Sequence, residues 1–253
     1  MIGRIDDRIE SERAFHDARY RSDPPALQHN FYTGLAESHD RFVALLAEFA
    51  AGDRVVELGC GLDTFAIELA ERGVEVVGID ISPVAVEKAR AAALGSGSTG
   101  ASFRVMNAES LEFEDKSVDG IIGAAVLHHL DLTSAYAEMS RVLRPGGRAV
   151  FFEPLGHNPL INWYRNRTPE ARTPHEHPLC RQDYHLASQW FEEVHVETFH
   201  LFGILTSPFS QRGWAKPLHR LASGIDRRVL AIGDRLRWHA WICLLYTSDA
   251  ADE

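Results

Sequence analysis

The chain has 253 residues, and 45% of them are hydrophobic, which is enough to fill the core of one α/β domain with added segments. Its 36 acidic and 26 basic residues leave a net charge of −10, and so acidic a chain is a poor nucleic-acid binder. Three cysteines do not make a disulfide framework, and no apolar run reaches bilayer-spanning length. Because the N-terminus does not resemble a signal peptide and Arg far outnumbers Lys, we expect a cytoplasmic, bacterial protein.

Residues 1–50 predict an N-terminal helical cap. Apolar residues recur at helical spacing over residues 42–49, and Gly52 marks the end of the pattern. Nearer the start, His16 and Asp17 are expected on a helix that covers the site, where they would contact a cofactor or an acceptor.

A strand, a tight turn, a helix and a second strand follow the cap. The first β-branched run spans residues 55–58 and ends at Gly59 and Gly61. A helical pattern over residues 64–72 then leads into a second β-branched run, over residues 76–80. Because glycine has no side chain, the backbone N–H groups of this turn can approach a ligand closely.

Three residues indicate which ligand fits this turn. Asp80 ends the second strand, where a carboxylate can accept both hydroxyls of a ribose, so the cofactor should contain a nucleoside. The dinucleotide fingerprint requires glycine where Thr64 stands. Glu57 would repel a pyrophosphate, but it suits a cofactor with an ammonium group, such as S-adenosylmethionine (SAM). A nicotinamide-dependent oxidoreductase is therefore the less favoured alternative.

The alternation of strands and helices continues beyond this unit. Residues 103–106, 117–123 and 148–153 each predict a strand, and a helix ends at the turn 141–147. This order is typical of a parallel sheet with helices on both faces.

Two motifs resemble one enzyme family. The run 57–61, Glu-Leu-Gly-Cys-Gly, resembles motif I of the class I SAM-dependent methyltransferases. The turn 143–147, Leu-Arg-Pro-Gly-Gly, stands where it does in the ubiquinone/menaquinone-biosynthesis and sterol methyltransferase branch. The resemblance covers residues 52–155 and departs at Asp63, which replaces a third glycine and is expected to cap the following helix.

The resemblance implies a fold and a set of cofactor contacts. The fold would be α/β: a Rossmann-like, mostly parallel seven-stranded sheet with helices on both faces, an N-terminal helical lid and C-terminal amphipathic helices. Its last strand would lie antiparallel beside the fifth and begin near residues 238–242. SAM would be the cofactor, and the step 107–109 would read the adenine edge. The implied cofactor-binding residues are Glu57, Gly59, Cys60, Gly61, Asp80, Ile81, Asn107, Ala108, Glu109 and Ala124.

Three histidines are candidates for a general base, which methyl transfer needs only if the acceptor loses a proton. His128 and His129 follow the fourth strand, and His157 follows the fifth. Each could instead cap a helix, pack, or stabilise a loop. The H-x-H-x-x-C spacing over residues 175–180 is not a standard zinc pattern, so no metal is expected.

The SAM-binding core is expected over residues 51–155. Residues 156–242 should supply acceptor-site loops and further strands. They include an irregular connection over 154–178, a helix over 181–189 and a strand over 194–199. Aromatic side chains gather there, which favours an apolar or aromatic small molecule. The basic amphipathic segment 216–241 suits peripheral contact with an anionic membrane, although packing on the sheet edge is the simpler interpretation.

The last eleven residues, 243–253, resemble an in-frame translation of a sequencing adapter, so we expect a non-native tail there. The function predicted for the rest is methyl transfer from SAM to an O or C atom of a small lipophilic or aromatic metabolite. A non-catalytic SAM-binding or scaffold protein is the other alternative, which Asp63 supports. Neither the acceptor nor the oligomeric state can be read from these motifs.

Overall fold

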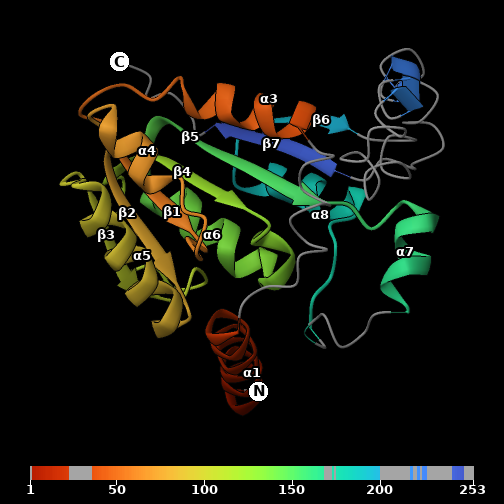
Figure 1. Ribbon diagram of the computed structural model, residues 1–253, viewed down its shortest axis with the longest axis horizontal. Coiled ribbons are helices and arrows are strands. Elements are labelled where there is room, and N and C mark those ends of the chain that lie inside the picture. The colour runs from red at the N-terminus through yellow and green to blue at the C-terminus, as the bar shows by residue number, and fades with distance from the viewer. Residues whose placement is uncertain are drawn as a thin grey trace.

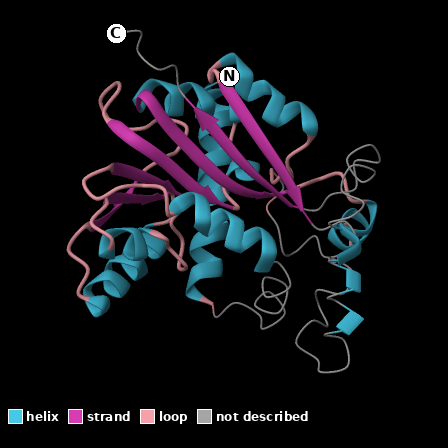
Figure 2. Ribbon diagram, turned by 90° about the horizontal axis from the view of Figure 1, so that it is seen from above, coloured by secondary structure: helices cyan, strands magenta, loops and turns pink. Residues whose placement is uncertain are grey.

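The computed structural model describes residues 2–22, 36–167, 173, 175–199, 217–218, 221–222, 224–226 and 241–247. These residues form a seven-stranded sheet with helices packed on both of its faces (Figures 1 and 2). The predicted α/β, Rossmann-like architecture is confirmed. No helix in the described ranges is long and apolar enough to span a bilayer.

The strands are β1 (Arg54–Leu58), β2 (Glu75–Asp80), β3 (Ala101–Val105), β4 (Val118–Ala124), β5 (Leu143–Pro154), β6 (Glu193–Phe199) and β7 (Trp241–Thr247). Their spatial order is β3-β2-β1-β4-β5-β7-β6. Strands β1 to β5 pair in parallel, whereas β7 runs antiparallel to both of its neighbours. The carboxyl ends of β1, β2, β3 and β4 therefore meet at one edge of the sheet, where open α/β sheets bind ligands.

The helices that lie wholly within the described ranges include α1 (Ile2–Arg21), α3 (Ala36–Leu46), α4 (Ala66–Glu71), α5 (Pro83–Ser96), α6 (Leu132–Val142), α7 (Pro159–Arg165) and α8 (Arg181–Leu186). Among the described residues, the short 3₁₀ helix η1 (Leu127–His129) follows β4, and η3 (Ala187–Gln189) follows α8. Figure 1 shows α1 outside the layers that cover the sheet.

Two hydrophobic clusters fill the two faces of the sheet, because successive strand side chains point in opposite directions. Val56 and Leu58 of β1 pack with α6, η3 and Tyr246 on one face. Val55 packs on the other face with α3, α4 and α5. There the Phe42 ring of α3 stacks on Phe152 of β5, with 5.8 Å between ring centroids.

The structure corrects one predicted connection and confirms one predicted strand. Residues 154–178 are not wholly irregular, because α7 begins at Pro159, a residue type whose fixed φ suits the first turn of a helix. The expected last strand, beside the fifth, is confirmed as β7, which includes five residues of the segment that resembles an adapter. Tyr246 is fully buried there. The origin of the tail stays a prediction, and the reading frame of the source gene would test it.

Candidate functional site

The loop after β1 is shaped by two glycines with positive φ, Gly59 at 65° and Gly61 at 49°. A Cβ on Gly59 would lie 2.8 Å from the Cγ2 atom of Val126, so only glycine fits there. The Cys60 N–H donates to the Ile79 carbonyl at 2.9 Å, which ties the loop to β2. The loop is thus held where its backbone can meet a ligand.

Glu57 fixes the start of the next helix. Its buried carboxylate accepts hydrogen bonds from the Phe65 N–H at 2.9 Å, the Ala66 N–H at 3.2 Å and the Thr64 hydroxyl. Burial raises its pKa to about 7, against these hydrogen bonds. The expectation that Asp63 caps α4 is wrong, because the strand residue Glu57 takes up the first donors of the helix.

Asp80 lies at the end of β2 and is 6% exposed. Its Oδ2 accepts the Gly61 N–H at 3.0 Å, and its Oδ1 accepts the Ser82 N–H at 2.8 Å. Burial raises its pKa, and the two backbone donors oppose that rise. Asp80 therefore joins the glycine loop to the start of α5, and it also lines the cavity described next.

A cavity of about 90 Å³ opens between α1 and the carboxyl ends of the strands. Its α1 wall consists of Arg8, Ile9, Glu12, His16 and Tyr20. Its opposite wall consists of Gly59, Ile79, Asp80, Ile81, Met106, Asn107, Ala108, Glu109, Ala125, Val126, His129 and Leu130.

The structure brings seven of the predicted site residues into this cavity, namely Gly59, Asp80, Ile81, Asn107, Ala108, Glu109 and His129. Their neighbours Glu57, Cys60, Gly61 and Ala124 do not line it. Glu57 and Gly61 instead support it through their hydrogen bonds to α4 and Asp80, while Cys60 and Ala124 pack in the hydrophobic cluster that contains Val55.

His128 is buried beside the cavity rather than in its wall. Its Nδ1 lies 2.8 Å from Oε2 of Glu153, whose Oε1 accepts the Val126 and Leu127 N–H groups. Burial lowers the pKa of His128 to about 4 and raises that of Glu153 to about 7. This pair therefore holds η1 against β5.

His157 also lies outside the cavity wall. Its Nε2 accepts the N–H of Arg181 at 2.9 Å, which fastens the connection after β5 to the start of α8. Of the three histidines predicted as bases, only His129 lines the cavity.

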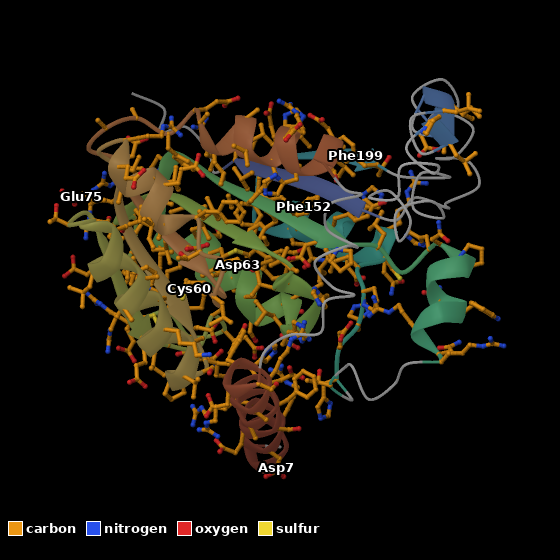
Figure 3. All side chains as sticks on the ribbon, viewed as in Figure 1. Asp7, Cys60, Asp63, Glu75, Phe152 and Phe199 are labelled. Carbon is orange, nitrogen blue, oxygen red and sulfur yellow. The ribbon has the colours of Figure 1, made fainter. Side chains whose placement is uncertain are left out.

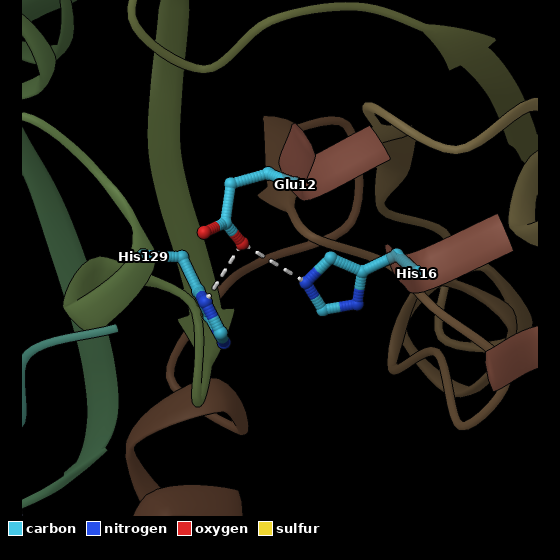
Figure 4. A group of neighbouring side chains, drawn as sticks. All are labelled: Glu12, His16 and His129. Atoms are coloured by element: carbon cyan, nitrogen blue, oxygen red, sulfur yellow. Dashed lines mark ion pairs between the residues drawn. The ribbon is translucent and has the colours of Figure 1, made fainter. Parts of the chain in front are cut away.

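Helix α1 brings two further titratable side chains to His129 (Figure 4). The Glu12 Oε2 lies 3.2 Å from the His129 Nδ1 and 3.6 Å from the His16 Nε2. His16 lines the cavity, and its expected contact with a cofactor or an acceptor stays a prediction, whereas Glu12 was not predicted at all. The signal available in the sequence was the four-residue spacing of Glu12 and His16, which puts both on one helix face.

Several polar contacts dock α1 over the strand ends. Arg8 pairs with Glu109 and donates to the His129 carbonyl at 3.1 Å. Asp17 accepts from the Ser82 hydroxyl, and the Lys88 ammonium donates to the Tyr20 carbonyl. Asp17 thus reaches the start of α5 rather than the cavity, while Asp7 lies on exposed surface of α1 (Figure 3).

The cavity residues fit SAM in chemical type. Asp80 offers a carboxylate at the end of β2, apolar side chains supply walls for a base, and Glu12 offers carboxylate oxygens that no hydrogen bond satisfies. Such an anion complements a sulfonium or ammonium group.

Sequence comparisons identify the chain's relatives. Residues 56–151 match the family model described as a methyltransferase domain. Aklanonic acid methyltransferase DauC of Streptomyces sp. (strain C5) is 33% identical over 160 residues, 61% of this chain and 69% of that protein. The ubiquinone/menaquinone biosynthesis C-methyltransferase UbiE of Geotalea daltonii is 32% identical over 125 residues, and the chain spans 53% of its length.

Solved structures share the fold at low identity. Phosphoethanolamine N-methyltransferase 2 of Haemonchus contortus, bound to SAM, aligns with a TM-score of 0.63 at 18% identity, over 86% of this chain and 52% of that one. Geranyl diphosphate C-methyltransferase of Streptomyces coelicolor aligns with a TM-score of 0.61 at 17% identity, over 84% and 78%. With the glycine loop, the strand order and these relatives together, the chain belongs to the class I SAM-dependent methyltransferases.

Proposed function

We propose that this methyltransferase, whose cofactor is SAM, methylates an O or C atom of a small lipophilic or aromatic metabolite. The observation that carries the proposal is one cavity in which Asp80 faces the same space as His129 and Glu12. The cavity thereby brings together Asp80, proposed to bind the cofactor, and His129, proposed to accept a proton. Relatives found by sequence include an O-methyltransferase and a C-methyltransferase by name, which supports both atom types.

The protein's part in the reaction is mainly to orient and to exclude water. When bound, SAM supplies an electrophilic methyl group on a sulfonium. Asp80 accepts hydrogen bonds from the ribose hydroxyls, and the step Asn107 to Glu109 borders the adenine. Glu57 acts from outside the cavity by holding the glycine loop and α4 in register.

His129 is the base in this proposal when the acceptor has a proton to lose. It lines the cavity, and burial lowers its pKa from the usual value of 6.5, so the imidazole is neutral near pH 7 and able to accept a proton. His128 and His157 are less suitable, because each is engaged outside the cavity wall.

The acceptor class follows from the other side chains of the wall. Ile9, Met106, Val126 and Leu130 present apolar surface to the cavity. An apolar or aromatic metabolite would bury this surface at about 25 cal/mol per Å². Membership of the methyltransferase family excludes the nicotinamide alternative. The scaffold alternative loses its support as well, since Asp63 is exposed and does not line the cavity.

Peripheral membrane contact through residues 216–241 stays a proposal, since most of that segment lies outside the described residues. Leu218 and Leu221 there are 50% and 60% exposed, which supports an apolar contact surface. Flotation with anionic vesicles tests it, and recovery of all the protein in the unbound fraction would count against it.

Calorimetry and turnover test the main proposal together. The protein should bind SAM and S-adenosylhomocysteine, and it should transfer labelled methyl groups to members of a panel of phenolic and polyketide-like acceptors. Tight SAM binding without transfer to any O or C acceptor in the panel, but with transfer to amines, would contradict the acceptor class.

A further inference from the structure

The carboxylate of Glu12 is buried, although its helix, α1, lies outside the layers that cover the sheet. The residue is 4% exposed, and it projects from α1 into the cavity. Neither of its oxygens has a hydrogen-bond partner of normal geometry among the described residues. A buried carboxylate is costly unless charged or polar groups compensate it. The groups that face it are the imidazoles of His129 and His16.

The charge states of this cluster follow from its surroundings. Burial alone would raise the pKa of Glu12, but the interactions with His129, His16 and Thr173 outweigh it and hold the pKa below its usual range. Burial lowers the pKa of His129, and Glu12 opposes that change. Near pH 7 an anionic Glu12 therefore faces a neutral His129.

An anion beside a neutral imidazole determines which of the two ring nitrogens carries the proton. The His129 Nδ1 makes no hydrogen bond of normal geometry with the described residues, but it lies 3.2 Å from the Glu12 Oε2, and a lone pair on Nδ1 would there face the carboxylate's negative charge. The proton therefore belongs on Nδ1, which leaves the lone pair on Nε2. A base held by a third group in this way is the arrangement that nucleophile-activating and proton-transfer sites share.

We propose that Glu12 is a positioning residue for His129: its carboxylate keeps the His129 proton on Nδ1 and so leaves Nε2 as the proton acceptor for methyl transfer. The inference deepens the proposed function and rests on it. In the transfer step the acceptor's O or C forms a bond to the methyl carbon as the carbon–sulfur bond breaks. The acceptor's proton goes to Nε2 of His129, and S-adenosylhomocysteine leaves.

The other titratable and charged groups near His129 do not determine its tautomer in the way that Glu12 does. His128 lies 4.2 Å away between ring centroids and is paired with Glu153. Glu176 is near His128 and His129 but pairs with Arg165. His16, 5.0 Å from His129 between centroids, and Arg8, which donates to the His129 carbonyl, bring no negative charge.

The alternative for Glu12, His16 and His129 is a divalent metal site, because their ligand atoms lie within 4.8 Å of one another. Two observations count against it. The Nδ1 of His16 is buried without a hydrogen-bond partner, whereas metal-binding histidines usually donate their second ring nitrogen. A divalent ion would also lie in the cavity that is proposed to hold the positive sulfonium of SAM.

The test needs no acceptor. Long-range ¹H–¹⁵N spectra of protein labelled at histidine report which ring nitrogen carries the proton, and His129→Gln assigns the signals of His129. We expect the Nδ1–H form in the wild type. In Glu12→Gln the His129 pKa should fall by about one unit, because the neighbouring negative charge is gone. Glu12→Asp should give an intermediate value.

Glu10→Gln is the matched control, since Glu10 is an exposed acid on the same helix whose partner is Arg13. It should leave the tautomer and the pKa of His129 unchanged. With an acceptor in hand, Glu12→Gln should lower kcat by up to about 100-fold, the range of general-base catalysis, and move the acid limb of the pH profile down with the pKa.

Three results would overturn the inference: an Nε2–H tautomer in the wild type, an unchanged His129 pKa in a folded Glu12→Gln variant, or stoichiometric metal in the purified protein that this variant loses. Calorimetric titration with SAM distinguishes failure of the inference about Glu12 from failure of the proposed function. A wild type that binds no SAM refutes the function whatever the tautomer of His129.

Discussion

The Oδ2 of Asp80 accepts the backbone N–H of Gly61 at 3.0 Å, which joins the end of β2 to the glycine loop that follows β1. One carboxylate thus shapes the loop and also lines the cavity. A residue in that position influences ligand binding both by direct contact and by holding the loop backbone.

Asp80→Ala should weaken SAM binding by at least about tenfold, since charge-assisted hydrogen bonds contribute about 1.5–3 kcal/mol each. Calorimetry measures the affinity directly. The matched control is Asp63→Ala, which removes an exposed carboxylate from the same loop and should leave affinity near the wild-type value. Equal affinities in the wild type and Asp80→Ala would remove Asp80 from the site.

Gly59→Ala should abolish measurable SAM binding, because the new methyl group would meet Val126 at 2.8 Å and the backbone has a φ of 65°. Gly97→Ala separates the two effects. Gly97 has a φ of 74° but open space around it, so this variant has the backbone strain without the clash. It should lose about 1 kcal/mol of stability and retain SAM affinity. An affinity in Gly59→Ala that matches Gly97→Ala would show that the close approach is unimportant.

The pair of Glu153 and His128 should matter more for stability than for chemistry. Glu153→Gln disturbs a buried carboxylate that accepts two backbone N–H groups and faces His128, so we expect a loss of about 1–3 kcal/mol in unfolding free energy. Urea titration measures it, with the exposed Glu193→Gln as control. If stability were unchanged and methyl transfer were lost, His128 would replace His129 as the base.

Glu57 should make the free energy of unfolding depend on pH in a definite direction. Its folded-state pKa is raised from 4.5 to about 7, so the native state binds the proton more tightly than the unfolded chain. The stabilising contribution is present at low pH and is lost as pH rises through about 7. The stability of the wild type relative to Glu57→Gln should therefore decrease between pH 5 and pH 8. Thermal unfolding of both proteins across that range tests the sign, and a relative stability that rises would contradict it.

The sequence was sufficient to predict the β–α–β core, because its signals are local. Strand periodicity, the glycine turn and the acid that ends β2 are all read from short stretches of sequence, and they predicted the loop at Gly59 and the strand end at Asp80 that line the cavity. Local rules also produced one error. They assigned the cap of α4 to Asp63, whereas the donors go to Glu57, which lies in β1 and reaches the helix only through the fold.

The pairing of Glu12 with His129 could not be predicted, because it joins a polar helix near the N-terminus to the 3₁₀ helix after β4. Periodicity shows which face of a helix is apolar, but α1 has no pronounced apolar face to indicate how it docks. Helix α7 was missed for a related reason: its surroundings are rich in Pro, His and Asn, which is typical of loops.

A crystal structure with S-adenosylhomocysteine tests the central claim most directly. The account predicts the nucleoside in the cavity between α1 and the strand ends, with the ribose hydroxyls on Asp80 and the sulfur on the side of His129 and Glu12. A nucleoside bound elsewhere, or one whose ribose does not contact Asp80 and whose sulfur faces away from His129, would contradict it.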